Sequence, residues 1–187
     1  MSGWKKKRDV MWRYDTTAGL YDRRYAEEQE AKIVAAMKHV KIEERSLALD
    51  AGCGTGLFFS HMTTKAGALV GVDISKKSLL VARKRAKTHG NVDLVLADAD
   101  NMPFKERAFN HVFAFTVVQN MPFPAETLKE LKRVAFEDAV FVVTGLKRIF
   151  ARKAFEALLR SAGLRVLTFE DGDNLKCYVA ICAAIRH

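Results

Sequence analysis

Apolar and polar positions change their spacing near residue 45 of the 187-residue chain. Before that point, Ile33, Met37 and Val40 recur near helical spacing with Lys and Glu between them, which predicts a helical segment over residues 1–45. After it, short apolar runs alternate with amphipathic stretches, the pattern of a parallel sheet covered by helices. The spacing therefore predicts an α/β fold.

The alternating part of the chain predicts the individual strands and helices. The expected strands are Leu47–Asp50, Leu69–Asp73, Asp93–Leu96, His111–Phe115, Ala139–Thr144, Arg165–Phe169 and Lys176–Ala183. The expected helices are Gly56–Thr64, Lys76–Thr88, Pro124–Val134 and Ile149–Ala162, with Gly90 and Gly163 as C-terminal caps. A short Asp-Gly-Asp-Asn turn between the last two strands favours an antiparallel hairpin. We expect a doubly wound, Rossmann-like, mostly parallel seven-stranded sheet closed by that hairpin, in one domain over 1–187.

The turn after the first strand, in the segment LALDAGCGTGLFF, is the most informative about chemistry. The strand ends at Asp50, and Gly52, Gly54 and Gly56 fill a tight turn that opens a helix. Glycine suits this position because the backbone must turn sharply and let a ligand approach with no Cβ in the way. A glycine-rich turn alone is weak evidence for a particular ligand, and here three further features accompany it at the expected intervals.

The ends of the next three predicted strands carry residues that suit a nucleoside ligand. Asp73 ends the second strand 17 residues after Gly56, where a carboxylate can accept hydrogen bonds from both ribose hydroxyls. Asp98 follows the third strand and can accept a hydrogen bond from an exocyclic amine of adenine. Phe115 and Thr116 follow the fourth strand, at the point where a doubly wound sheet reverses its strand order and binds ligands.

Two nucleoside-binding families compete for this pattern. A dinucleotide fold has the spacing G-x-G-x-x-G, and Leu57 stands where its third glycine belongs. The run from Asp50 to Gly56, taken with Asp73 and Asp98, instead resembles the class I methyltransferases that use S-adenosylmethionine. The resemblance covers residues 14–183.

This resemblance implies a role for each matching residue. Asp50 and the backbone of the glycine turn should hold the methionine part of S-adenosylmethionine, Asp73 the ribose, and Asp98 the adenine edge. The implied cofactor-binding set is Tyr21, Asp50, Gly52, Cys53, Gly54, Gly56, Asp73, Ile74, Asp98, Ala99 and Phe115. Residues 1–45 should form a helical cap over the cofactor, with Tyr14, Tyr21 and Tyr25 as candidates to close the pocket.

Composition and charge indicate where the protein is located in the cell and how its charge is distributed along the chain. The chain is 49% hydrophobic, yet no apolar run approaches the ~20 residues of a membrane span, and no signal-peptide pattern opens it. Three cysteines without paired spacing favour a reducing, cytoplasmic location, and the five histidines show no metal-ligand spacing. Of the net charge of +9, residues 1–90 contribute +8, from 18 basic and 10 acidic side chains.

The placement of the basic residues favours an RNA substrate, either tRNA or rRNA. Lys147 and Arg148 follow the fifth strand with Arg152 and Lys153 close behind, and residues 5–8 are all basic. No lid insertion separates the fifth strand from its helix, which suits a macromolecular acceptor. The expected substrate-binding residues are Tyr14, Thr116, Lys147 and Arg148. A small zinc-binding activator subunit, used by some similar enzymes, could pair with the edge strand Asp93–Leu96.

Two alternatives remain open at this point. A small-molecule methyltransferase of the quinone or natural-product type would have an apolar pocket lined by Phe58, Phe115 and Phe123. A non-catalytic cofactor-binding subunit is the other alternative. The sequence identifies no catalytic base, because methyl transfer to a ready nucleophile needs mainly alignment. Gln119 and Asn120, just past the fourth strand, are the candidates to orient an acceptor.

Overall fold

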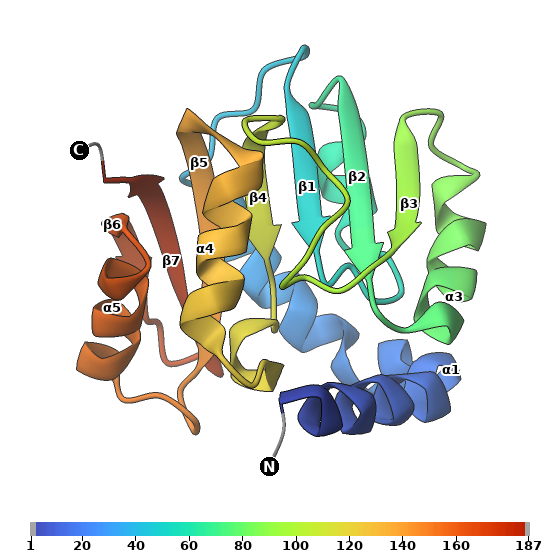
Figure 1. Cartoon of the computed structure of the whole chain (residues 1–187). Coiled ribbons are helices and arrows are strands. Elements are labelled where there is room, and N and C mark those ends of the chain that lie inside the picture. The colour runs from blue at the N-terminus through green and yellow to red at the C-terminus, as the bar shows by residue number, and fades with distance from the viewer. Residues whose placement is uncertain (1–2, 186–187) are drawn as a thin grey trace.

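A seven-stranded sheet forms the centre of the computed structural model, which describes residues 3–185 (Figure 1). The strand order is β3-β2-β1-β4-β5-β7-β6, and β7 alone runs antiparallel to its neighbours. The bounds are β1 Leu47–Ala51, β2 Ala68–Asp73, β3 Val92–Leu96, β4 Phe109–Ala114, β5 Ala135–Leu146, β6 Leu164–Glu170 and β7 Cys177–Ala184. The predicted fold class is confirmed, with β3 at one edge and the closing hairpin at the other.

Helices cover both faces of this sheet. They are α1 Gly3–Met37, α2 Phe59–Met62, α3 Lys76–Ala86, α4 Pro124–Val134 and α5 Arg152–Ser161, with a short 3₁₀ turn, η1, at Val118–Asn120. One buried cluster joins the sheet to α4 and α5 through Leu128, Leu131 and Phe155. A second joins the opposite face to α1, α2 and α3 through residues such as Ile33 and Met62. The two clusters give the three-layer arrangement expected of a doubly wound sheet.

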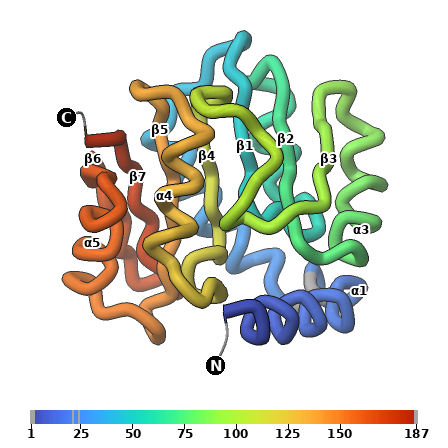
Figure 2. The backbone as a smooth tube through the Cα atoms, in the orientation of Figure 1, coloured from blue at the N-terminus to red at the C-terminus, as the bar shows by residue number. Residues whose placement is uncertain are grey.

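Helix α1 changes direction as it passes the sheet. Figures 1 and 2 show its first part lying across the carboxyl ends of the central strands and its later part rising behind them. The first part therefore covers the edge where a doubly wound sheet binds its ligands. Helix α1 ends at Met37, earlier than the predicted residue 45. Within residues 3–185, no helix combines the length and apolarity needed to cross a bilayer.

Most element bounds match the prediction within about two residues. Helix α5 begins at Arg152 and not at the predicted Ile149, and three further differences have local reasons. Helix α2 begins only at Phe59 because Gly56 has a left-handed backbone, with φ of +82°. Helix α3 ends at Ala86, so the prediction that Gly90 caps it is wrong, whereas Gly163 adopts the φ of +78° expected of a cap after α5. Strand β5 begins at Ala135, directly after α4, where it pairs with Phe109 across a bulge in the β4–β5 register.

Candidate active site

The glycine-rich loop after β1 is held in its turn by the end of β2. Gly52, Gly54 and Gly56 have φ of +71°, +55° and +82°. The backbone N–H groups of Gly52 and Cys53 both donate to the carbonyl oxygen of Val72, at 2.7 and 2.9 Å. The loop therefore presents backbone, rather than side chains, at the carboxyl end of the sheet.

Asp73, the last residue of β2, connects this loop to the next helix. Its Oδ2 accepts a hydrogen bond from the Gly54 N–H at 2.8 Å, and its Oδ1 accepts one from the Ser75 N–H at 2.7 Å. Burial raises the pKa of the Asp73 carboxyl, although these two N–H groups favour the ionised form and lower it. The carboxylate thus fixes both the loop and the start of α3.

Asp50, at the end of β1, is the most strongly perturbed acid of the site. Its exposed fraction is 3%. Burial, and after it the nearby charge of Asp73, raises the pKa of the Asp50 carboxyl to about 8. A carboxyl in this state is mostly neutral at pH 7 and ionises when a cation binds beside it. The loop therefore contains an acid suited to a positively charged ligand.

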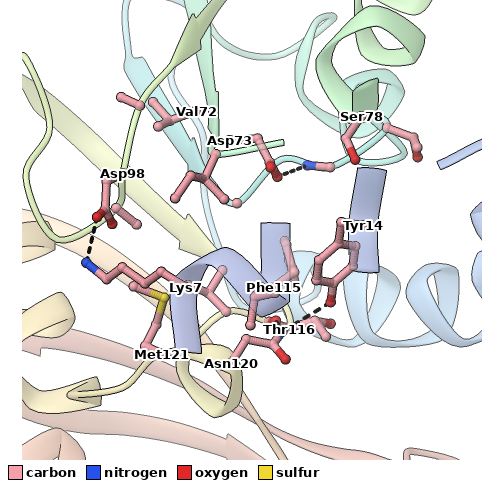
Figure 3. A pocket seen from close by; sticks show the side chains of 18 residues that line it. Lys7, Tyr14, Val72, Asp73, Ser78, Asp98, Phe115, Thr116, Asn120 and Met121 are labelled. Atoms are coloured by element: carbon pink, nitrogen blue, oxygen red, sulfur yellow. Dashed lines mark hydrogen bonds and ion pairs between the residues drawn. The ribbon is translucent and has the colours of Figure 1, made fainter. Parts of the chain in front are cut away.

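A cavity opens between the glycine loop, the ends of β2, β3 and β4, and helix α1 (Figure 3). Its wall includes the predicted cofactor residues Gly52, Gly54, Asp73, Ile74, Asp98, Ala99 and Phe115. Asp50 and Cys53 line a smaller neighbouring cavity, which shares Gly52 and Gly54 with the first. Gly56 lines neither cavity, and the side chain of Tyr21 lies outside the described residues. We call the first cavity the cofactor cavity.

Helix α1 closes the cofactor cavity with side chains at helical spacing. Lys7, Val10 and Tyr14 all face into it. The Lys7 ammonium donates to Asp98 Oδ2 at 2.6 Å (Figure 3). It also lies 2.5 Å from Asp100 Oδ2. Sequence reasoning missed this contact, because a Lys inside a basic run reads as solvent-exposed.

The predicted basic rim over residues 5–8 is therefore incomplete. Lys7 points into the cofactor cavity, and the Lys6 ammonium donates to the carbonyl oxygen of Met121 at 2.6 Å. Only Lys5 and Arg8 are exposed without such a contact among the described residues. The expected continuous phosphate track is not formed on this side.

Two aspartates anchor α1 over the site. The Ser75 hydroxyl donates to Asp15 at 2.6 Å, which ties α1 to the start of α3. Seven residues later, Asp22 accepts a hydrogen bond from Thr55 of the glycine loop at 2.7 Å and an ion-pair bond from Arg85 at 2.6 Å. These contacts hold the first part of α1 against the loop.

Thr116, just past β4, has a left-handed backbone, with φ of +61°. Its N–H donates to Thr144 Oγ1 at 2.8 Å. Its hydroxyl oxygen accepts hydrogen bonds from the Lys32 ammonium at 3.0 Å and from the Gln29 amide at 3.3 Å. Lys32 is 1% exposed, and its anionic contact is Glu28, at 3.4 Å. A buried positive charge thus lies directly behind Thr116, which the sequence did not predict.

The two candidates for orienting an acceptor have different surroundings. Asn120 lines the cofactor cavity, donates from Nδ2 to the Tyr14 hydroxyl at 3.1 Å and accepts from Arg13 at 2.9 Å. Gln119 is half-buried and lines none of the cavities described here, and its buried side-chain amide has no hydrogen-bond partner among the described residues. Asn120 is therefore at the site and Gln119 is not.

A second, larger cavity of about 670 Å³ adjoins the first. It shares Tyr14, Thr116 and Asn120 with the cofactor cavity. The rest of its wall is Arg13, Thr17, Tyr25, Glu28, Gln29, Leu146, Lys147, Arg148 and Lys176. All four predicted substrate-side residues thus line this space, which we call the acceptor cavity.

The apolar pocket expected of a quinone-type enzyme is not formed by the predicted aromatic residues. Phe58 and Phe115 are buried, with ring centroids 5.1 Å apart. Phe123 is 59% exposed and lies next to Gly3 at the start of α1. None of these rings lines the acceptor cavity: Phe115 borders the cofactor cavity, and Phe58 and Phe115 together border the smaller cavity beside it.

The cysteines and the central histidine have structural surroundings. Burial raises the pKa of Cys182 to about 12 and also raises that of Cys177, which disfavours their thiolates. His111 Nε2 lies 3.0 Å from the carbonyl oxygen of Lys41, and burial lowers its pKa. Within residues 3–185, no group of three His, Cys, Asp or Glu side chains is placed to hold a metal ion.

The comparison with known families shows which family the chain belongs to. Residues 49–143 match the family model described as a methyltransferase domain. The chain belongs to this methyltransferase family. The matched span contains the glycine loop, Asp73, Asp98 and Thr116, so the family likeness rests on the site just described. The enzymes of this class take their methyl group from S-adenosylmethionine, which is the cofactor of this methyltransferase.

Relatives and solved structures agree with this assignment. The demethylmenaquinone methyltransferase of Staphylococcus saprophyticus is 33% identical over 136 residues, which cover 69% of this chain and 58% of the relative. The methyltransferase thus spans only about three fifths of that curated relative.

Solved structures share the fold at lower identity. A Burkholderia thailandensis 1,6-didemethyltoxoflavin-N1-methyltransferase, solved with its substrate and S-adenosylhomocysteine, has a TM-score of 0.86 at 13% identity, covering 100% of this chain and 92% of that one. A methyltransferase solved in complex with the Haloferax volcanii Trm112 activator has a TM-score of 0.80 at 18% identity, covering 92% of this chain and 98% of that one.

The cofactor cavity fits S-adenosylmethionine on two structural grounds. A Cβ added at Gly54 would meet no atom within 4 Å, so the loop backbone there borders free space. Asp50 is a buried acid whose raised pKa makes it responsive to a cation, and S-adenosylmethionine carries a sulfonium and an ammonium group. The loop therefore leaves open space beside its backbone at Gly54, and Asp50 in the adjoining cavity offers a counter-charge to the cationic cofactor.

Proposed function

We propose that this methyltransferase modifies a small molecule bound in the acceptor cavity. The observation that carries the proposal is that this cavity, of about 670 Å³, shares three wall residues with the cofactor cavity. Its volume lies within the range of roughly 300–1,000 Å³ typical of small-molecule sites. The shared residues Tyr14, Thr116 and Asn120 would separate donor from acceptor by a single layer of side chains.

The cofactor set implied by the sequence would bind in the following way. Asp73 would accept the ribose hydroxyls and Asp98 the adenine amine, beside the Ala99 backbone. Lys7 now occupies the Asp98 carboxylate, so adenine binding at that edge requires the ammonium to stay with Asp100 alone. Asp50 and the loop N–H groups would hold the methionine part.

Alignment is the catalytic contribution that these residues support. S-adenosylmethionine supplies a methyl group that is already activated for displacement. Thr116 would donate its hydroxyl hydrogen to an acceptor oxygen, since its two lone pairs are used by Lys32 and Gln29. Asn120, held by Arg13 and Tyr14, would fix the other side of the acceptor.

An RNA substrate has less support. The relatives named above include enzymes named for demethylmenaquinone and for didemethyltoxoflavin, and none of those names refers to RNA. Two cations of the expected RNA-binding rim are paired within the protein, Lys147 with Asp171 at 2.8 Å and Arg152 with Glu156 at 3.1 Å. A phosphate track would need these charges to face outward and unpaired.

A labelling experiment tests the proposed substrate class. Purified enzyme and radiolabelled S-adenosylmethionine are incubated with a cell extract, and the labelled product is sorted by size and by sensitivity to ribonuclease and protease. We expect the label in the small-molecule fraction, and Thr116→Val should reduce that label up to about tenfold through loss of the hydrogen bond that its hydroxyl donates to the acceptor. Label lost on ribonuclease treatment would contradict the proposal.

We also propose that a small activator protein pairs with the outer edge of β3. This edge strand is only five residues long, and Leu96 at its end is 56% exposed. An unpaired strand edge is a ready surface for β-augmentation. The likeness to the methyltransferase captured with Trm112 supports an activator of that kind.

Size-exclusion chromatography with a Trm112-type activator tests the edge. Wild-type protein should co-elute with the activator, and Leu96→Lys should abolish co-elution because a lysine blocks pairing at a strand edge. Leu80→Lys, at a leucine of α3 that is 52% exposed, is the matched control and should still co-elute. Separate elution of the wild-type proteins would rule the partner out.

A further inference from the structure

The wall of the acceptor cavity carries an excess of positive charge. Four cationic side chains, Arg13, Lys147, Arg148 and Lys176, face one carboxylate, Glu28. The formal excess on the wall is therefore three positive charges. A cleft lined by one sign of charge with protein walls concentrates ligands of the opposite sign.

Two of these four cations form ion pairs with carboxylates, and two do not. The Lys147 ammonium lies 2.8 Å from Asp171, and the Lys176 ammonium lies 3.3 Å from Glu28, so each lysine has a carboxylate partner. Arg13 and Arg148 have no carboxylate within ion-pair distance among the described residues. The two guanidinium groups therefore account for the uncompensated charge.

The surroundings of Arg13 orient it for recognition. Its guanidinium carbon lies 5.2 Å from the centre of the Tyr14 ring, and one of its nitrogens donates to Asn120 at 2.9 Å. Tyr14 and Asn120 both belong to the boundary with the cofactor cavity. A guanidinium fixed on an aromatic face in this way keeps further N–H donors for a ligand.

The buried ammonium group of Lys32 adds to the positive electrostatic potential of the acceptor cavity. Lys32 lies behind Thr116 at 1% exposure, with its ammonium 3.0 Å from the threonine hydroxyl oxygen. Its anionic contact, Glu28, is divided between Lys32 at 3.4 Å and Lys176 at 3.3 Å. One carboxylate thus serves two ammonium groups, and the floor of the acceptor cavity retains positive character.

We propose that the acceptor cavity binds a small molecule that carries a carboxylate or a phosphate, held by Arg13 and Arg148, with Thr116 donating to the reacting end. This inference rests on the proposed small-molecule function and specifies its substrate class. Planar guanidinium groups match both anions through paired N–H donors. An uncharged quinone would instead leave both groups unpaired, and Leu146 is the one aliphatic residue of the described wall.

Binding of matched charged and neutral probes tests the proposal. The protein is first saturated with S-adenosylhomocysteine, so that anions do not enter the cofactor cavity. Benzoate is then compared with benzamide, and phenyl phosphate with phenol, by ligand-observed NMR and calorimetry. We expect each anion to bind at least about tenfold more tightly than its neutral counterpart, with an affinity that falls as salt rises.

Arginine variants test whether Arg13 and Arg148 are the side chains that bind the anionic probes. Arg148→Gln should remove at least about tenfold of anion affinity, and Arg13→Gln should do the same. Arg160→Gln, at an exposed arginine near the end of α5, is the matched control and should bind the anions as the wild type does. Unchanged binding of S-adenosylhomocysteine verifies that each variant is folded.

Several results would overturn the inference. Equal affinity for the charged and neutral probes, or anion binding unaffected by both arginine variants, would contradict it. An RNA oligonucleotide that binds through Arg13 and Arg148 and is not displaced by the probes would also contradict it. A neutral methylated metabolite in the labelling experiment would refute this inference while leaving the small-molecule function standing, whereas labelled RNA would refute both.

Discussion

Replacing Asp50 with Asn should stabilise the ligand-free methyltransferase and remove most of its affinity for S-adenosylmethionine. Burial and the charge of Asp73 raise the pKa of Asp50 to about 8 in the folded chain, while the unfolded chain keeps the ordinary value of 3.8. Between these two values the folded state holds a proton that the unfolded state has lost, so the free energy of unfolding falls as pH rises. At pH 7 the effect amounts to roughly 4 kcal/mol, which Asn would largely recover.

The cofactor affinity of the same variant should change in the opposite direction. Ionised Asp50 would face the cationic cofactor, so binding must release the proton that Asp50 holds at neutral pH. In the wild type, affinity should rise about tenfold per pH unit between about pH 5.5 and 7, and Asp50→Asn should abolish this dependence. Calorimetry in buffers of different ionisation enthalpy measures the released proton directly.

Asp93→Asn provides the control for both measurements. Asp93 is an exposed acid of β3 outside the cofactor cavity, so its replacement should change neither the unfolding free energy appreciably nor the cofactor affinity. Thermal and denaturant unfolding of the three proteins at pH 5 and pH 7.5 provides the stability data. A less stable Asp50→Asn protein, or one that binds the cofactor normally, would show that Asp50 does not have this role.

The sheet and its ligand-binding edge could be predicted because their signals are local. Each parallel strand is a short apolar run, and its ligand-facing residue follows directly, as with Asp50, Asp73 and Asp98. Parallel order brings the carboxyl ends of these strands to one edge of the sheet. The cofactor cavity accordingly contains seven of the eleven residues predicted for it, and Asp50 and Cys53 line the cavity beside it.

The contributions of the long helix α1 could not be predicted in the same way. Lys7 and Lys32 occupy polar positions of a helix that reads as charged along its whole length. Their partners, Asp98 and Thr116, are 91 and 84 residues away in sequence. Which lysine turns inward depends on how helix α1 bends around the sheet, and the spacing of residues within the helix does not predict that bend.

The RNA interpretation illustrates the same difficulty with charge. A count of basic residues treats each Lys and Arg as available, whereas Lys147 forms an ion pair with Asp171, on the far side of α5 in sequence. Charge pairing across distant segments removes part of the basic surface that the sequence suggests. Of the basic residues that keep no carboxylate partner among the described residues, Arg13 and Arg148 lie in the acceptor cavity, whose size suits a small ligand.

Alanine substitutions in the glycine loop should also have large effects, on stability at Gly52 and on cofactor binding at Gly54. The two positions share a left-handed backbone and differ in the atoms that surround them. Gly52 and Gly54 both have left-handed backbones, so alanine at either position costs about 1 kcal/mol in backbone strain. A Cβ at Gly52 would lie 2.6 Å from Val117 Cγ2, in the buried core, whereas a Cβ at Gly54 meets no atom within 4 Å. Gly52→Ala should therefore lose about 2–5 kcal/mol of stability, since overpacking adds to the strain.

Gly54→Ala should fold nearly as well as the wild type and still fail to bind the cofactor. Its new methyl group would enter the space beside the loop that we assign to S-adenosylmethionine, and a loss of at least a hundredfold in affinity is expected, about 3 kcal/mol. Gly19→Ala in α1 is the control, because its Cβ also meets no atom within 4 Å and its backbone is not left-handed. It should be neutral or more stable by up to about 1 kcal/mol. Normal cofactor affinity in a folded Gly54→Ala protein would place the cofactor elsewhere.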